Sequence, residues 1–467
     1  MLLQQLHYMK FSFIYGFTIL ILLMSCDDST KNKTIYFGGH IKNPKDNAVF
    51  IYKKDAKIAT TQLNHDHNFI FKLDSLDTGL YTFKHGEEYQ YIYLEQKDSL
   101  LIRLNTWDFD GSLVFSGKGA NRNNFLIQLF LENEREDRQF YNYFNLDENA
   151  FSHKIDSILI LKKLQFKHFK ENSVKQNRAF EDLVKVVMYF PIYANKEEYP
   201  LHYKKYHHLE KLPKLSKSYY QHREMVKNNT NPFKNYYAYN NYLWNKIYNK
   251  SYYQHELETH KDLSVILLNQ IVKQVDDEDL KNSMLQQTFI NSLFDSNCSE
   301  KSKNLTKQLF YNNCTCDIKK EKVTNILSVI NNLRNKERLP EFYLKNTKDK
   351  IINSKELLKS NLVIYFWPKE VNRIQNMAKR VNYLVKRYPK IRFVGIDGQL
   401  NNFNWKAYAK ANGLELSNQF QLMEENKDLF YTNDFPRAII LNNKGIIQNN
   451  FTFISQKNFE DFLIKLN

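Results

Sequence analysis

Glycine is scarce in this chain, at 12 of 467 residues. Phosphate-binding loops need closely spaced glycines, because these let the backbone approach the phosphate. The sequence has no such loop, and it also lacks the serine elbow of hydrolases and the paired-histidine helix of zinc proteases. These motif-defined enzyme classes are therefore excluded, and no cofactor is expected.

Cysteine is also scarce, with four residues in the chain: Cys26, Cys298, Cys314 and Cys316. A structural zinc site needs four ligands. No nearby histidine has the spacing to complete such a set around the last three cysteines. We therefore expect no metal site.

Long apolar runs are absent except near the N-terminus, where residues 11–24 form one. This run is short for a membrane span and has the usual length of a signal-peptide core. It ends at Leu23-Met24-Ser25-Cys26, which resembles a lipobox. The resemblance implies a signal peptide over residues 1–25, a diacylglycerol on Cys26 that anchors the protein to a membrane, and a polar tether over 26–33. An ordinary signal peptide or an uncleaved anchor is the alternative.

The chain is basic, with a formal net charge of +16. Such a charge permits contact with nucleic acid or an anionic surface. The lysines, however, are spread along the chain, and no basic run carries the interleaved aromatic residues of a nucleic-acid groove. We interpret the charge as solvated and expect no nucleic-acid partner.

Residues 34–120 show short runs of alternating apolar residues separated by turn signals, which predicts an antiparallel β-sandwich or barrel. The segment resembles the small β domain of unknown function that precedes thioredoxin-like domains in many Bacteroidetes lipoproteins. The resemblance rests on the strand order, the turn Gly79-Leu80-Tyr81, the hairpin 95–100 and the closing Ser116-Gly117-Lys118-Gly119. It implies no reaction.

Residues 121–335 change to helical stripes with almost no glycine, which predicts an all-helical domain. The stretch 219–253 is dense in tyrosine, phenylalanine and tryptophan. Such rings could form a binding face for a glycan or a peptide. Packing between helices is the interpretation that we favour.

Residues 336–467 carry an α/β pattern. A continuous apolar run over 362–367 is typical of a central parallel strand, and a helix is predicted directly after it, over 372–387. The order strand, helix, strand, helix, hairpin, helix resembles the thioredoxin fold of membrane-tethered thiol-disulfide oxidoreductases. Its most specific marks are Phe366-Trp367 at a strand end and Pro436, which matches the cis-proline facing the redox pair in that family.

The redox cysteines of that family are replaced in this sequence. In active members of that family, the first cysteine of a Cys-x-x-Cys pair lies four positions after the tryptophan. In this sequence the two cysteine positions are occupied by Val371 and Ile374. Disulfide exchange requires a thiolate on the helix N-terminus. The sequence therefore predicts a redox-inactive domain.

An inactive thioredoxin fold still has a groove that faces peptides. The residue before the cis-proline, here Phe435, can pair with the backbone of an extended segment. Trp367, Phe435 and Pro436 form the candidate peptide groove. The alternative is a fold kept only as a structural module.

The remaining cysteines lie in the helical region, in a compartment that permits disulfides. Cys298 could pair with Cys314 or with Cys316, and the spacing does not choose between them. A redox couple formed by Cys314 and Cys316 is the less favoured alternative.

Together these observations predict a multidomain α+β lipoprotein of the outer membrane in a Bacteroidetes-type cell, on its periplasmic or its surface face. It is expected to bind an envelope protein, as an accessory subunit, rather than to catalyse. Two alternatives stay open: a thiol-disulfide oxidoreductase that uses Cys298, Cys314 and Cys316, and a glycan or peptide receptor that uses the tyrosine-rich region.

Overall fold

The structure, a computed structural model, describes residues 33–54, 56–74, 76–227, 233, 236–295, 297–368, 371–398, 405–430, 437–456 and 458–466. The expected signal peptide, Cys26 and nearly all of the tether lie outside the described residues, as do Phe435 and Pro436. No helix in the described ranges is long and apolar enough to cross a membrane.

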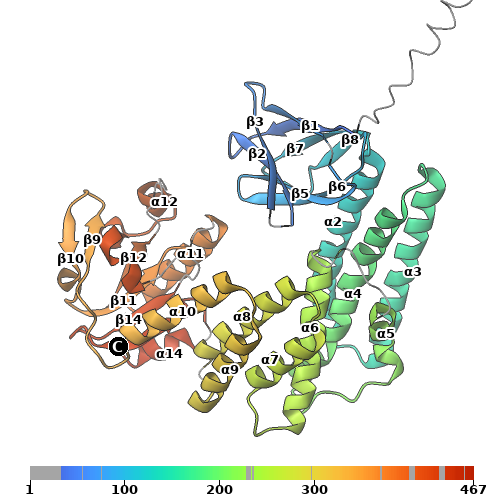
Figure 1. The fold of residues 1–467 in the computed structure, drawn as a ribbon. Coiled ribbons are helices and arrows are strands. Elements are labelled where there is room, and N and C mark those ends of the chain that lie inside the picture. Colours follow the sequence, from blue (N-terminus) through green and yellow to red (C-terminus); the bar gives the residue numbers. More distant parts are fainter. Residues whose placement is uncertain are drawn as a thin grey trace, which may run out of the picture. The chain divides into compact units, whose positions relative to one another are not determined.

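The chain divides into two compact units. Figure 1 labels their helices and strands. The first runs to Asn195 and also includes Leu215–Tyr239, and the second comprises Lys196–Lys214 and Asn240–Asn467. The division falls within the helical region, which the sequence suggested as one domain over residues 121–335. Two long helices, α4 Arg178–Tyr206 and α6 Tyr237–Leu257, each have residues in both units.

The first unit begins with short strands. In chain order they are β1 Ile35–Lys42, β2 Ala48–Lys53, β3 Ala56–Gln62, β4 Asn68–Leu73, β5 Gly79–His85, β6 Glu88–Leu94, β7 Ser99–Asn105 and β8 Val114–Lys118. Within the described residues they form two four-stranded sheets, ordered β4-β1-β7-β8 and β3-β2-β5-β6. Inward-facing side chains of both sheets share one core, in which the rings of Phe37 and Phe83 lie 5.7 Å apart. The segment is therefore a sandwich.

One strand pair departs from the expected antiparallel pattern. β1 pairs with β7 in parallel, with Phe37 opposite Leu100. The sheet that contains them is therefore mixed. Alternation of apolar residues reports which face of a strand is buried but does not report the direction of its partner.

The sandwich ends at a turn into the first long helix. Gly119 adopts a left-handed φ of 99°, and a Cβ at this position would lie 3.0 Å from side-chain atoms of Asp98 and Arg122. Those two side chains form a buried ion pair. Only glycine fits this turn without strain.

The helices that follow in the first unit are α2 Ala120–Tyr143, α3 Glu148–Asn172, the N-terminal part of α4 Arg178–Tyr206, the 3₁₀ turn η1 Ser218–Tyr220 and α5 His222–Lys227. Asp147 caps α3 by accepting a hydrogen bond from the backbone N–H of Ala150 at 2.9 Å. Such a cap satisfies one of the amides that a helix start leaves unpaired.

The second unit contains the rest of the helical region. Its helices are α6 Tyr237–Leu257, of which all but the first residues belong here, α7 Leu263–Gln274, α8 Glu278–Phe294, α9 Glu300–Asn313 and α10 Asp317–Asn332. Asp277 caps α8, and Ser299 caps α9. The ring of Phe294 in α8 stacks on that of Phe451 at 3.8 Å, which joins these helices to the sheet that follows.

The remaining elements form the C-terminal domain. They are β9 Tyr343–Asn346, β10 Ile351–Asn353, η2 Ser354–Leu357, β11 Asn361–Phe366, α11 Val371–Arg387, β12 Ile391–Asp397, α12 Trp405–Ala411, η3 Leu416–Asn418, β13 Gln419–Leu422, η4 Glu424–Asn426, α13 Lys427–Phe430, β14 Ala438–Leu441, β15 Ile447–Thr452 and α14 Phe459–Ile464. The strand order is β10-β9-β13-β12-β11-β14-β15.

The central strands have the arrangement that the sequence predicted. β11 pairs with β12 in parallel and with β14 antiparallel, and β14 pairs with β15 antiparallel. One face of the sheet packs on α11 and α14, and the other packs on the end of α10 and on α13. The domain therefore has a thioredoxin-like fold, with two covered faces that explain the uninterrupted apolar run of β11.

Candidate functional site

The candidate site lies where β11 ends and α11 begins. The backbone N–H of Trp367 donates to the carbonyl of Ile396 at 3.0 Å, which holds the strand end against β12. The Trp367 side chain is 2% exposed, and among the described residues its indole Nε1 has no hydrogen-bond acceptor. A buried polar group without a partner costs free energy.

The first turn of α11 carries aliphatic residues. The helix begins at Val371, and Ile374 follows one turn later with no exposed surface. Ile374 packs in a core cluster that includes Trp367 and Ala378. Ile374, at one of the two positions matched by sequence to redox cysteines, is therefore part of the hydrophobic core.

Arg437 lies at the other side of the site, immediately before β14. It is 1% exposed, and among the described residues no carboxylate pairs with it. Its guanidinium donates to the backbone carbonyls of Phe430 at 2.7 Å and Asn450 at 3.3 Å. It also lies 5.3 Å from the ring centre of Phe366 and 5.0 Å from that of Phe451. The electron-rich faces of these two rings and the two carbonyl oxygens stabilise the positive charge of Arg437 in place of a carboxylate.

Burial lowers the pKa of Arg437 below the usual range of a guanidinium. The group still carries its charge at neutral pH. Its bond to Phe430 connects the two residues that flank positions 431–436, the segment with Phe435 and Pro436. Sequence reasoning missed Arg437, although an arginine before the apolar run Ala438-Ile439-Ile440-Leu441 was a visible signal.

Asp397 is a second buried charged residue near the site. It ends β12 and is fully buried, and Gln421 Nε2 lies 3.4 Å from its Oδ2. β12 is the neighbour of β11, so this carboxyl group belongs to the same end of the sheet as Trp367.

The C-terminal domain is similar in structure to thioredoxin-like thiol-disulfide oxidoreductase domains. One is the thioredoxin domain of a thiol-disulfide oxidoreductase from Bacteroides vulgatus, with 13% identity, a TM-score of 0.26, and coverage of 29% of this chain and 99% of that one. Another is a thiol:disulfide interchange protein from a Bacteroides species, with 19% identity, a TM-score of 0.22, and coverage of 25% and 80%. A domain of a possible thiol-disulfide isomerase from Cytophaga hutchinsonii has 16% identity, a TM-score of 0.25, and coverage of 28% and 92%.

No protein-family model and no curated protein matches the sequence. The three structures named above each cover less than a third of this chain. The activities in these protein names belong to the similar proteins and are not assigned to this chain.

The structure does not bring the remaining cysteines together for the expected disulfide. Cys298 precedes α9, whereas Cys314 follows it. A helix of 14 residues is about 21 Å long, and a disulfide requires Cα atoms within about 7 Å. Cys298, Cys314 and Cys316 are all free thiols. Burial raises the pKa of the Cys298 and Cys314 thiols, which lowers their nucleophilicity at neutral pH.

The described rings of the tyrosine-rich stretch 219–253 are buried or half-buried. Tyr219, Tyr236 and Tyr242 are at most 4% exposed and serve as packing. The half-buried rings, Tyr237 among them, keep some exposed surface. Packing between helices and a binding face both stay predictions for this stretch.

Among the residues that the structure describes, no group of three or more His, Cys, Asp or Glu side chains could hold a metal ion. The described part of the site at the end of β11 contains Trp367, Ile374, the buried cation Arg437 and the buried carboxyl group of Asp397.

Proposed function

We propose that this chain is a lipid-anchored envelope lipoprotein whose thioredoxin-like domain binds a protein partner and does not exchange disulfides. The observation that carries the proposal is the burial of Ile374 in the core at the start of α11. Residues 336–467 contain no cysteine at all. The domain therefore has the fold of an oxidoreductase without its nucleophile.

The binding part of the proposal concerns the groove beside Trp367. Trp367 is buried with no acceptor for its indole N–H among the described residues, and an extended segment that gains access to it would supply a backbone carbonyl. Arg437 donates to the carbonyl of Phe430, so the two described residues on either side of positions 431–436 are held together. Such preorganisation would reduce the entropy that binding costs.

The anchoring part of the proposal rests on the sequence alone. Cys26 after a short apolar run supports lipidation, the outer membrane as location and an envelope protein as partner. Replacement of Cys26 by serine should abolish incorporation of a labelled fatty acid and release the protein from the membrane fraction. Retention of the label would contradict lipidation at this residue.

Redox inactivity can be tested with the full mature chain. Reduction of a model disulfide by dithiothreitol should proceed at the same rate with and without the protein. Catalysis that disappears in Cys314→Ser or Cys316→Ser would instead establish the oxidoreductase alternative.

Partner binding can be tested by crosslinking in intact cells, with purification through a C-terminal tag. A stoichiometric envelope protein is expected, and its yield should fall in a Trp367→Phe variant, which keeps an aromatic ring in the core and removes only the indole N–H. An exposed Tyr383→Ala variant serves as the matched control, since Tyr383 lies on the solvent side of α11 with 45% exposure. Recovery of the chain alone would contradict the accessory-subunit proposal.

A further inference from the structure

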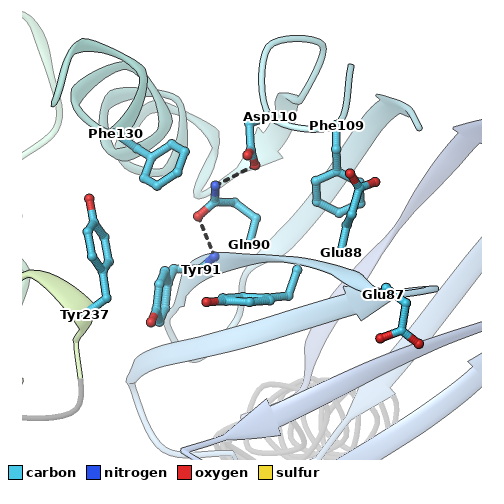
Figure 2. A pocket seen from close by; sticks show the side chains of 9 residues that line it. Glu87, Glu88, Gln90, Tyr91, Phe109, Asp110, Phe130 and Tyr237 are labelled. Atoms are coloured by element: carbon cyan, nitrogen blue, oxygen red, sulfur yellow. Dashed lines mark hydrogen bonds between the residues drawn. The ribbon is translucent and has the colours of Figure 1, made fainter. Parts of the chain in front are cut away.

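A hollow of about 370 Å³ lies in the first unit, beside β6. Its walls come from four parts of the chain, namely the β5–β6 turn with β6, the loop before β8, helix α2 and the first residue of α6. Figure 2 shows the side chains of Gln90, Tyr91, Asp110, Phe130 and Tyr237 around one space, with Glu87 pointing away from them. The volume lies within the range of small-molecule sites.

The rim of the hollow is acidic. Glu88 and Asp110 both line it, and no lysine or arginine of the described chain lines it or forms an ion pair with either of them. Glu87 also lines the rim, but its carboxylate lies 3.6 Å from the Lys84 ammonium. Glu88 and Asp110 are therefore the carboxylates that lack a cation in direct contact.

Gln90 fixes the position of Asp110. Its Nε2 donates to Asp110 Oδ1 at 2.7 Å, and its Oε1 accepts from the backbone N–H of Tyr91 at 2.8 Å (Figure 2). Gln90 is 5% exposed, and both bonds are partly buried. One carboxylate of the rim is thus held in place before any ligand arrives.

The charges around these carboxylates are mostly negative. Burial raises the pKa of Asp110, and Glu134 and Asp108 raise it further, while the hydrogen bond from Gln90 opposes them. Burial also raises the pKa of Glu88, and the negative charge of Asp110 raises it further. The positive charge of Lys45 partly offsets this increase in pKa. A cation between the two carboxylates would relieve this repulsion.

Aromatic rings form the rest of the wall. Tyr91 and Tyr237 are stacked with ring centres 6.3 Å apart, and Phe130 meets Tyr237 edge to face at 6.1 Å. Phe109 forms part of the buried floor. Ring faces attract cations and also cover aliphatic groups.

We propose that this hollow binds an organic cation, an ammonium or guanidinium group on an aliphatic stem. The stem would lie against Tyr91, Phe130 and Tyr237, and the charged end would lie between Glu88 and Asp110. A lysine or arginine side chain of a polypeptide has this chemistry. The inference does not depend on the proposed function, because the hollow belongs to the other unit of the chain.

Isothermal titration of the full mature chain tests the proposal. The probes are Nα-acetyl-lysine amide, Nα-acetyl-arginine amide and ethanolamine, and the neutral control is Nα-acetyl-norleucine amide. At least one cation should bind about tenfold more tightly than norleucine amide. Preference for an amino-acid probe identifies a polypeptide side chain as ligand, whereas equal binding of ethanolamine identifies a free or lipid-borne amine.

Variants separate charge from folding. Glu88→Gln and Asp110→Asn should each weaken cation binding by about tenfold at unchanged melting temperature. The matched control is Glu171→Gln, because Glu171 is an exposed carboxylate of α3 outside the hollow. Binding should also weaken as the pH falls from 7, beginning above the ordinary carboxyl range. Equal affinity for norleucine amide, or unchanged binding in both rim variants, would overturn the proposal.

Discussion

Arg437 donates a hydrogen bond from Nη2 to the backbone carbonyl of Phe430 at 2.7 Å, across a segment of six residues. The same guanidinium reaches the carbonyl of Asn450, which belongs to β15. One buried cation thus connects α13, β14 and β15. Replacement of Arg437 should therefore lower the free energy of unfolding of the C-terminal domain.

Substitution of Arg437 by lysine is expected to lower the free energy of unfolding by about 1–3 kcal/mol, because a buried carbonyl loses its donor. Lysine has no planar fork and is more strongly hydrated than arginine. The change should therefore be no milder than Arg437→Met, which removes the buried charge. Urea denaturation measures both.

The control for Arg437 is Arg373→Lys in α11. Arg373 is exposed, so this change should stay within about 0.5 kcal/mol of wild type. Equal stability of the Arg437→Lys protein would show that the two carbonyls do not need a guanidinium.

Lys162 offers a second test, in the first unit. Its ammonium is 2% exposed and lies 2.9 Å from both Glu136 Oε2 and Asn133 Oδ1. Glu136→Leu should destabilise the protein by about 3–5 kcal/mol, because it leaves a buried cation without a counter-charge. Lys162→Met should cost less, since Glu136 is 21% exposed and can be hydrated. Thermal melts of the two variants decide the order, and the reverse order would contradict this account.

The sequence predicted the centre of the C-terminal domain well. β11, α11 and β12 follow from a buried apolar run, a helical stripe and a second apolar run, and these signals are local. β13 was missed, because Gln419-Phe420-Gln421-Leu422 is short and half polar. Its pairing with β9 and β12 is a tertiary contact that no local pattern reports.

The hollow beside β6 could not be predicted from the sequence. Its walls combine Tyr91, Asp110, Phe130 and Tyr237, which are separated by up to about 150 positions and share no motif. The absence of redox cysteines, in contrast, was visible at once, because Val371 and Ile374 stand at fixed positions after Trp367. Motifs of close spacing are readable from the sequence, whereas sites assembled by folding are not.

Glu460 predicts how the stability of the C-terminal domain depends on pH. Its carboxylate in α14 accepts from Tyr388 at 2.8 Å and pairs with Arg380 at 2.8 Å and Arg387 at 3.0 Å. The hydrogen bond from Tyr388, followed by that from Arg380, lowers the pKa of Glu460 below its ordinary value. A carboxyl with a lowered folded-state pKa stabilises the fold above its unfolded pKa and loses this contribution as the pH falls through the folded one.

Glu460→Gln should therefore lower the free energy of unfolding by about 1 kcal/mol at pH 7, and the difference from wild type should shrink below pH 4. Urea denaturation at pH 7, 5 and 3.5 measures it. Glu425→Gln is the control, because Glu425 forms no ion pair among the described residues. A difference that persists unchanged at pH 3.5 would show that the charge of Glu460 is not its cause.

Restoration of the missing pair gives the sharpest test of the C-terminal site. The double variant Val371→Cys with Ile374→Cys places two thiols one helical turn apart at the start of α11. It should be made in a background in which Cys298, Cys314 and Cys316 are serine, so that only the new thiols can react. Loss of the buried Ile374 side chain is expected to cost about 1–3 kcal/mol of stability.

If only these two side chains separate the domain from an active oxidoreductase, the double variant should form an intramolecular disulfide and catalyse reduction of a model disulfide. The helix N-terminus should lower the pKa of the first thiol, which raises its reactivity at neutral pH. The single variants are the controls, because each supplies a nucleophile without a resolving thiol and should not turn over. A folded double variant that forms no disulfide would show that the first turn of α11 departs from the active geometry beyond its side chains.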